Sequence, residues 1–218
     1  MGQMTLVIGN KNYSSWSLRP WIAMRQVDIP FTEHLIPLFD ENWKAEVSKV
    51  SPTEKVPVLI DGEVSVWETL AILEYVNEKF PDRGLWPAAS DARALARAVS
   101  MEMHAGFGNL RGNMPMNIRK DLSGKGMGLG VAEDIKRISE LWNECRTKFG
   151  QGGPFLFGTF TIADAMYAPV VSRFTTFGVK LDDVCQAYCD AVLDTKAYRE
   201  WKEAAVKETW TVAEDEID

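Results

Sequence analysis

Apolar and polar residues change their spacing along the first third of the chain, from a strand pattern to a helical one and back. A short apolar run over residues 5–8 ends at a Gly-Asn pair, which is typical of a buried strand. Helical spacing follows from Ser17 to Val27, with Pro20 in the opening turn, where a missing N–H has little effect. The pattern then predicts a second strand over residues 31–36 and a short polar helix over residues 41–50.

The clearest local pattern is a β-hairpin followed directly by a helix. Two apolar runs, at residues 56–60 and 63–66, flank the pair Asp61-Gly62, which is typical of tight hairpin turns. Residues 68–80 then carry apolar side chains at helical spacing. This order predicts a mixed four-stranded sheet, with one parallel βαβ unit and one antiparallel hairpin, covered by helices.

The remainder of the chain shows only helical periodicity. Residues 81–90 are rich in Pro, Gly and small residues and are expected to link two domains, while the tail after Trp210 is expected to be loose. The fold class is therefore α/β plus all-α, with a sheet domain over residues 1–80 and a helical bundle over residues 91–218. Helices are predicted over residues 91–120, 131–149, 162–177, 181–193 and 196–207.

Composition and charge narrow the classes of function. A chain of 218 residues, 46 % hydrophobic and 25 % charged, fits two ordinary globular domains of about 100 residues each. The net charge of −7 disfavours a nucleic-acid surface, which needs clustered Lys and Arg. No apolar run is long enough to span a membrane, and the first residues do not form a secretory signal, so a cytoplasmic protein is expected.

Two further features of the sequence do not indicate a catalytic or binding site. Cys145, Cys185 and Cys189 are expected to be free thiols in a reducing compartment, and no His or third Cys near the last two indicates a metal site. The glycine-rich stretch at 123–130 follows a predicted helix rather than a strand and lacks a Gly-Lys-Ser/Thr ending. It is therefore interpreted as an interhelical loop and not as a phosphate cradle.

Three separate segments carry residues suited to binding a small polar ligand. The hydroxyl-rich run at 12–17 opens the first helix, where Ser side chains cap a helix and free N–H groups also bind anions. In Lys55-Val56-Pro57, the proline leaves Val56 extended, with its own N–H and C=O free to pair with a ligand, and a cis bond is possible. Glu68-Thr69 is either an acidic first turn or a pair that holds an ammonium and a carboxylate group.

Together these segments resemble the cytosolic glutathione transferase superfamily, nearest in motif to the zeta class, over almost the whole chain. Ser14-Ser15-Trp16-Ser17 with Arg19 is similar to the zeta motif Ser-Ser-Cys-Ser…Arg, and Val56-Pro57 is similar to the family's cis-proline. Glu68-Thr69 is similar to its Glu/Gln-Ser/Thr pair. In the second half, Gly158…Thr161-x-x-Asp164 is similar to the family's helix-capping signature, and Thr161 with Asp164 predicts a capping box.

This resemblance implies a thioredoxin-like first domain, glutathione as co-substrate without a metal, and a homodimer. It implies that Ser14 and Ser15 contact the glutathione thiol, with Ser14 preferred because it matches the first Ser of the motif and because its neighbours are expected to cap the helix. The activated sulfur would then attack a small electrophile. Residues implied to bind glutathione are Ser15, Trp16, Lys55, Val56, Pro57, Glu68 and Thr69.

The second substrate's pocket is expected against the first long helix of the carboxyl-terminal half. Arg111 and Asn113 form a polar pair suited to an acidic substrate, whereas Phe107 and Met114 are apolar residues of the kind more often found in a core. His104 on the same helix is more consistent with a packed or surface histidine than with a catalytic base.

Two alternatives are weighed against a transferase. A thiol oxidoreductase needs a cysteine at the start of the first helix, and the amino-terminal half contains none. A non-catalytic binding or scaffold protein would keep the fold and the capping box while losing the glutathione contacts, which here persist. Trp16 stands where the zeta class has Cys, so the isomerisation of maleylacetoacetate does not follow, and the second substrate is left open.

Overall fold

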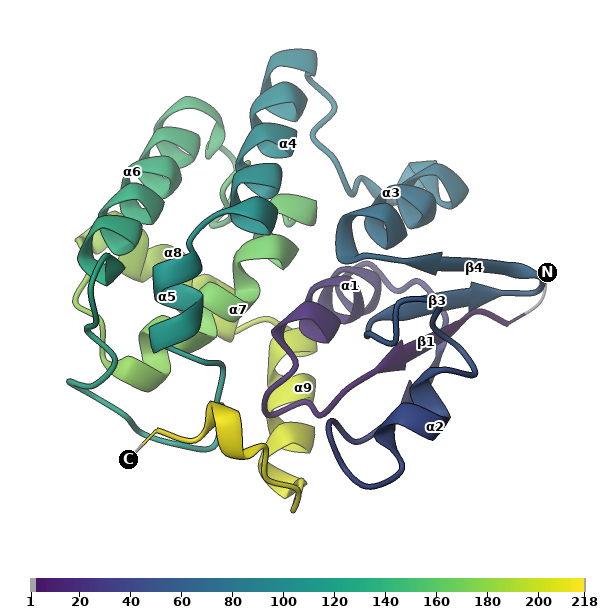
Figure 1. The fold of residues 1–218 in the computed structure, drawn as a ribbon. Coiled ribbons are helices and arrows are strands. Elements are labelled where there is room, and N and C mark those ends of the chain that lie inside the picture. Colours follow the sequence, from purple (N-terminus) through teal and green to yellow (C-terminus); the bar gives the residue numbers. More distant parts are fainter. Residues whose placement is uncertain (1–2, 218) are drawn as a thin grey trace.

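The computed structural model describes residues 3–217, and their first third forms one four-stranded sheet with three helices (Figure 1). The strand order is β2-β1-β3-β4, in which β1 and β2 are parallel and the other two pairings are antiparallel. The predicted mixed sheet with one βαβ unit and one hairpin is therefore confirmed. Its elements are β1 (Thr5–Ile8), α1 (Ser15–Gln26), β2 (Thr32–Leu35), α2 (Trp43–Val47), β3 (Val58–Asp61), β4 (Val64–Trp67) and α3 (Thr69–Lys79).

The hairpin turn lies one residue later than the sequence pattern indicates. Asp61 pairs with Val64 as the last rung of the ladder, so the turn residues are Gly62 and Glu63. Gly62 has a φ of 61°, a left-handed conformation that glycine adopts without steric penalty. Asp61 belongs to the strand instead, where its carboxylate accepts a hydrogen bond of 2.7 Å from the Tyr75 hydroxyl on α3.

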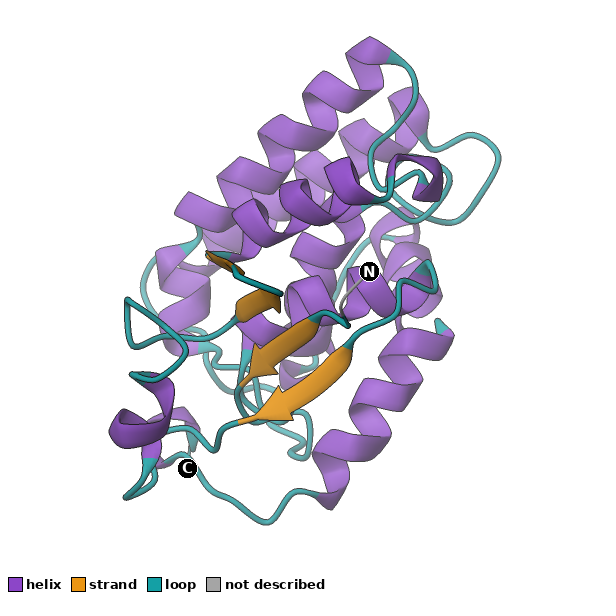
Figure 2. Ribbon diagram, turned by 90° about the vertical axis from the view of Figure 1, so that its right-hand side faces the viewer, coloured by secondary structure: helices purple, strands orange, loops and turns teal. Residues whose placement is uncertain are grey.

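Helix α1 lies at the centre of the molecule, between the sheet and the helical half (Figures 1 and 2). It contacts β1 and α3 on the sheet side and α7 and α9 on the other side. As a result it is buried over most of its length, including the polar residue Arg19. The start of α1 is thus fixed by both halves of the chain at once, which suits a site that needs a rigid helix end.

The carboxyl-terminal half is helical, and its first helix is shorter than the sequence indicates. The prediction of one helix over residues 91–120 is wrong, because the chain breaks at Gly106 and Phe107 and leaves helical geometry again after Asn113. A side chain at Gly106 would lie 2.7 Å from the Glu102 carbonyl, and Phe107 has a φ of 56°. The helices are α4 (Ser90–Ala105), α5 (Gly108–Asn113), α6 (Val131–Phe149), α7 (Ile162–Phe177), α8 (Asp183–Leu193) and α9 (Lys196–Lys207), with short 3-10 turns at Pro81–Arg83 and Ala213–Asp215.

The predicted capping box at the start of α7 is confirmed. Thr161 is the N-cap, and its N–H donates to the Asp164 carboxylate at 2.7 Å. The Leu156 N–H donates to the other carboxylate oxygen at 3.0 Å. The side chain of Asp164 is fully buried, so these bonds tie the preceding loop to the helix where water cannot replace them. Within residues 3–217 no helix is both long enough and apolar enough to cross a membrane.

Residues 211–217 are held against the rest of the chain, so the prediction that the tail after Trp210 is loose is wrong for the described residues. The Glu216 carboxylate accepts hydrogen bonds from the Tyr13 hydroxyl at 2.6 Å and from the Asn117 amide at 2.9 Å. Arg119 donates to the Trp210 carbonyl at 2.8 Å and to the Tyr13 hydroxyl at 2.7 Å. These partners lie 91 to 203 residues from the tail in sequence, which is why its acidic composition alone suggested a solvated end.

Candidate active site

Helix α1 begins with a hydroxyl network that joins it to the end of β1. The Ser14 hydroxyl donates to the Ser17 hydroxyl at 2.7 Å, and it accepts from the Ser17 N–H at 3.4 Å as the N-cap. The Ser17 hydroxyl oxygen in turn accepts the Gly9 N–H at 3.1 Å. Ser14 is therefore itself the capping residue, and the expectation that its neighbours cap the helix while Ser14 points away is wrong.

Ser15, the first residue of the helix, has a free hydroxyl. The Ser15 side chain forms no hydrogen bond with any residue from 3 to 217, although its N–H donates to the Tyr13 carbonyl at 2.9 Å. Both Ser14 and Ser15 are 7 % exposed and line the same cavity. The positive end of the helix dipole lies at this position, which favours an anion beside the two hydroxyls.

The Trp16 ring is surrounded by cationic and imidazole groups. The Arg19 guanidinium lies 4.2 Å from the ring centroid, and that of Arg111 lies 5.5 Å from it. His104 meets the same ring edge-on at 5.3 Å. Arg19 is fully buried, and its Nη2 has no hydrogen-bond partner among the described residues. Burial, together with the positive charges of Arg173 and Arg111, lowers the pKa of Arg19.

The residues predicted to bind glutathione lie on two adjoining cavities. The smaller one, of about 190 Å³, is formed by the start of α1, the segment before β3 and the start of α3. Thr69 is tied to α1 by its hydroxyl, which donates to the Trp16 carbonyl at 3.1 Å. The bond between Val56 and Pro57 is cis. The smaller cavity is lined by Trp16, Thr53, Lys55, Val56, Pro57, Glu68, Thr69 and His104.

Glu68 lines this smaller cavity and has an unusual backbone conformation. It precedes α3 with a φ of 68° and a ψ of 128°, a region that non-glycine residues rarely occupy. Its side chain makes no capping hydrogen bond and is exposed. Backbone strain of this kind persists where the surrounding structure fixes it, and it concentrates at ligand sites. The conformation is consistent with a carboxylate that is held out for a ligand.

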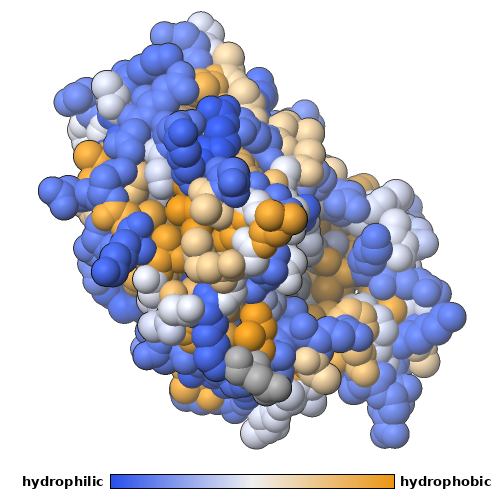
Figure 3. Space-filling view, turned by 60° about the vertical axis from the view of Figure 1, so that its left-hand side comes forward, coloured by the Kyte–Doolittle hydropathy of each residue, from blue (hydrophilic) through white to orange (hydrophobic). Residues whose placement is uncertain are grey.

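The larger cavity, of about 530 Å³, shares Trp16, Thr53, Lys55 and Val56 with the smaller one. Ser14 and Ser15 line it together with apolar side chains that include Phe39 and Trp43. In Figure 3 a hollow with apolar residues at its base separates the helical part from the part that carries the sheet. A ligand in the larger cavity would contact apolar side chains and the start of α1 together.

Of the four residues predicted for the second pocket, Arg111 lines the larger cavity. Phe107 and Met114 are buried in the hydrophobic core. The Asn113 amide donates to the Asn109 carbonyl at 2.8 Å, and its side chain packs against Gly128 of the glycine-rich loop. Arg111 is thus the one of these four residues that the structure places on the wall of the larger cavity.

The same cavity is lined by three charged residues that the sequence analysis did not predict, Glu54, Arg173 and Asp215. Arg173, from the middle of α7, is buried, and burial lowers its pKa to about 10. Asp215, from the carboxyl-terminal segment, has a pKa raised to about 6 by burial. The position of Arg173 within the apolar sequence of α7 was a usable signal, because an arginine is rarely buried without a role. Asp215 gave no such signal.

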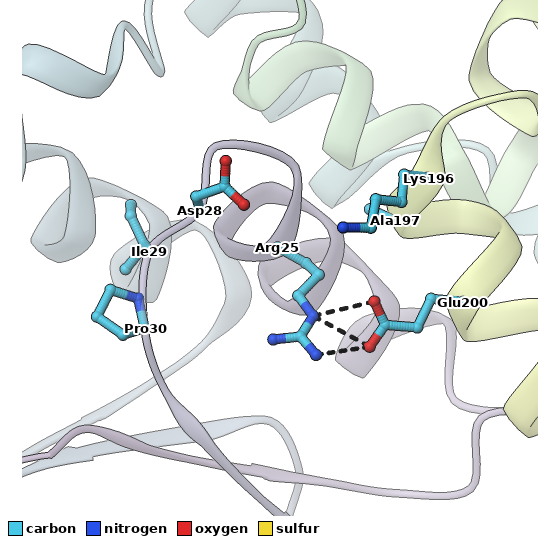
Figure 4. A pocket seen from close by; sticks show the side chains of 7 residues that line it. All are labelled: Arg25, Asp28, Ile29, Pro30, Lys196, Ala197 and Glu200. Carbon is cyan, nitrogen blue, oxygen red and sulfur yellow. Dashed lines mark hydrogen bonds and ion pairs between the residues drawn. The ribbon is translucent and has the colours of Figure 1, made fainter.

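Other pockets and side-chain groups among the described residues are weaker candidates for a functional site. The pocket in Figure 4, of about 320 Å³, lies between the far end of α1 and α9, where Arg25 and Glu200 form an ion pair of 2.6 Å on its lining.

The three cysteines are free and buried, and burial raises the pKa values of Cys145 and Cys185 to about 12, so these thiols are unreactive. No group of three or more His, Cys, Asp or Glu side chains within residues 3–217 is arranged to hold a metal ion.

Comparison with known proteins matches both halves of the chain. Residues 13–79 match a family described as the glutathione S-transferase amino-terminal domain, and residues 130–203 match the corresponding carboxyl-terminal domain. A protein named probable maleylacetoacetate isomerase from Caenorhabditis elegans is 29 % identical over 175 residues, which are 77 % of this chain and 77 % of that protein. Dichloromethane dehalogenase from Methylorubrum extorquens is 42 % identical over 65 residues, which are 29 % of this chain and 23 % of that protein.

Solved structures show the same fold. The chain superposes with a TM-score of 0.72 on a glutathione transferase homologue from Burkholderia that was crystallised with bound glutathione. The two share 19 % sequence identity, and the match covers 94 % of this chain and 98 % of the other. The predicted fold class, a thioredoxin-like domain followed by a helical bundle, is confirmed by this match and by the observed topology.

Proposed function

The chain belongs to the glutathione S-transferase superfamily, and we propose that it binds glutathione in the smaller cavity and uses its thiol to attack an electrophile in the larger one. The observation that carries this proposal is the convergence of three distant segments on adjoining cavities. The start of α1, Val56-Pro57 and Glu68-Thr69 come together there, and Trp16 lines both cavities. Each segment supplies the kind of group that one part of the tripeptide requires.

Glutathione is held through its charged ends and its backbone in this proposal. The exposed Glu68 carboxylate accepts from the γ-glutamyl ammonium group, and Thr69 offers its N–H at the start of α3 to the adjacent carboxylate. Val56 pairs through its backbone with the cysteinyl residue, and Lys55 favours the carboxylate at the other end. Ser15 and Trp16 are left beside the sulfur.

The start of α1 activates the thiol. An ordinary thiol has a pKa near 8.5 and is only ~3 % ionised at pH 7. A decrease of two units requires about 2.7 kcal/mol of preferential stabilisation of the thiolate. One hydroxyl donating to the anion contributes ~1.5–3 kcal/mol, and the helix dipole adds ~0.3–1 kcal/mol. Ser14 and Ser15 both line the cavity, and the free hydroxyl of Ser15 favours it as the donor.

The electrophile binds in the larger cavity, and its chemistry follows from the walls. Apolar and aromatic side chains suit an aromatic or alkyl body, while Arg111 and Arg173 suit a carboxylate. The names of the two relatives point to an isomerisation and to a dehalogenation, and both reaction types belong in a substrate survey. We therefore propose conjugation or isomerisation of a small acidic or aromatic electrophile.

Calorimetric titration with glutathione tests this function first. We expect saturable binding, followed by glutathione-dependent turnover in a panel of aryl halides, dihalomethanes, maleylacetone, peroxides and aryl ethers. Binding without turnover across the panel would favour a binding or scaffold role. Absence of binding would refute the proposed use of the smaller cavity.

We further propose a homodimer in the cytoplasm. A groove of about 220 Å³ between α3 and α4 is lined by Leu70, Ala71 and Met101, and the side chain of Met101 is 54 % exposed. Trp67 at the end of β4 adds a further exposed aromatic ring. Pairing of two copies across this surface would remove these apolar side chains from water. The free thiols fit a reducing compartment.

A further inference from the structure

The carboxyl-terminal segment, residues 208–217, forms part of the wall of the larger cavity. At its start, the Glu208 carboxylate accepts the N–H groups of Lys11 and Asn12 at 2.7 and 3.0 Å. At its end, Glu216 accepts from the Tyr13 hydroxyl, and Lys120 pairs with the same carboxylate. The segment is therefore held at both ends against the loop that leads into α1.

Asp215 is the residue that this attachment places in the cavity. It lines the same cavity as Arg111 and Arg173. Its N–H donates to the Val212 carbonyl at 3.1 Å, whereas its carboxylate forms no hydrogen bond and no ion pair within 4 Å with the described residues. Its neighbours differ, because the Glu216 carboxylate is bonded and Glu214 is exposed. The carboxylate of Asp215 is thus committed to no direct partner.

The two arginines of the cavity also lack a direct carboxylate partner. Arg173 donates from Nε to the Met114 carbonyl at 2.7 Å and from Nη1 to the Pro169 carbonyl at 3.3 Å, both neutral acceptors. The Arg111 Nε is buried and has no hydrogen-bond partner in the part of the chain described. Attraction between Asp215 and Arg173 acts on the pKa values of both groups, although burial has the larger effect on each. Asp215 therefore offsets part of the positive charge of the two arginines across the cavity rather than by direct contact, and Lys55 and Glu54 line the same cavity.

We propose that Asp215 is a specificity-determining residue that partly neutralises the Arg111–Arg173 pair and so limits how strongly the larger cavity attracts substrates with two carboxylates. The inference rests on the proposed function, in which this cavity holds the electrophile. A second carboxylate on a ligand would compete with Asp215 for the arginines and would be repelled by it. A neutral or singly charged ligand avoids this repulsion. The anion selectivity of the site is then set by the last turn of the chain.

Asp215→Asn tests this inference, because it removes the charge and keeps the shape. Succinate serves as the dianionic probe and its neutral diamide, succinamide, as the matched uncharged probe, each titrated by calorimetry at pH 8, well above the value of about 6 for the pKa of Asp215. We expect Asp215→Asn to bind succinate about tenfold more tightly than the wild type, equivalent to ~1.4 kcal/mol. Succinamide binding should stay unchanged.

Glu214→Gln is the control, since it makes the same change in net charge one residue away at an exposed position outside the cavity. It should leave both affinities unchanged. Equal succinate affinity in the wild type and Asp215→Asn would overturn the inference, and so would an equal gain in Glu214→Gln. Glutathione binding, measured on the same samples, tests the proposed function separately. A wild-type protein that does not bind glutathione would contradict that function, whereas the comparison of succinate affinities would still test the role of Asp215.

Discussion

At the scale of single residues, Ser14 and Ser15 are adjacent hydroxyls with different tasks. Ser14 is bonded to Ser17 and caps α1, whereas the hydroxyl of Ser15 is free on the cavity wall. The motif alone gave Ser14 the leading role at the thiol. A hydroxyl that already donates to Ser17 must give up that bond before it can donate to a sulfur, so the hydrogen bonds favour Ser15.

We predict that Ser15→Ala lowers glutathione-dependent turnover about 10–100-fold, equivalent to ~1.4–2.8 kcal/mol of transition-state stabilisation, because the thiolate loses its donor. Ser14→Ala should act mainly on folding and lower the free energy of unfolding by about 0.5–2 kcal/mol through the lost cap. Steady-state kinetics and urea denaturation of both variants measure the two effects. The opposite pattern, with turnover lost only in Ser14→Ala, would restore the order indicated by the motif.

Glu68→Ala should weaken glutathione binding more than it weakens folding. The side chain caps nothing and is exposed, so its loss changes the free energy of unfolding by no more than ~0.3–1 kcal/mol. Loss of a charge-assisted bond to an ammonium group should raise the dissociation constant of glutathione about tenfold or more. Calorimetry checks this, with Glu63→Ala in the exposed hairpin turn as the control. An unchanged affinity would place the γ-glutamyl group elsewhere.

At the scale of elements, local pattern predicted most of the fold and failed where distant contacts decide. The strands, the capping box and helices α6 to α9 follow from periodicity and cap residues that act within a few positions. The break at Gly106 depends instead on the Glu102 carbonyl and on a left-handed Phe107, neither of which a period reveals. The tail is ordered by Tyr13, Asn117 and Arg119, partners that only the folded chain brings near.

Glu208 joins the end of α9 to the loop before α1, and its removal should loosen both. Glu208→Ala leaves the N–H groups of Lys11 and Asn12 without an acceptor, which costs about 1–3 kcal/mol of unfolding free energy. Amide hydrogen exchange at these two residues should speed up. Glu203→Ala, an exposed position on the same helix, is the control. Unchanged exchange at Lys11 and Asn12 would mean that this attachment does not hold the loop.

At the scale of the whole molecule, the site exists only because both halves of the chain fold together. The sequence indicated the residues that we propose to hold glutathione, since each lies in a short recognisable motif. It did not place Arg173 and Asp215 in this cavity, because α7 packs against α1 and the carboxyl-terminal segment is held by hydrogen bonds to the loop before α1. The pocket proposed for the second substrate is therefore formed by tertiary contacts, which local sequence patterns do not predict.

Assembly into a dimer is tested at the surface between α3 and α4. Met101→Glu places a charge on the exposed apolar face and should convert the protein to a monomer at micromolar concentration in light scattering. Val206→Glu is the matched control, because Val206 is 53 % exposed on α9, away from this groove. If both variants remain dimeric, another surface makes the contact. A wild-type protein that is only monomeric would reject the dimer itself.

We propose above all that the start of α1 receives the sulfur of glutathione and stabilises its thiolate. Ultraviolet absorbance of the thiolate, titrated against pH in the complex of the wild-type protein with glutathione, measures this directly. We predict a midpoint about two pH units below the value of ~8.5 for an ordinary thiol, with the shift reduced in Ser15→Ala. A saturated complex whose thiol titrates at its ordinary pKa would contradict the proposed stabilisation of the thiolate by the start of α1.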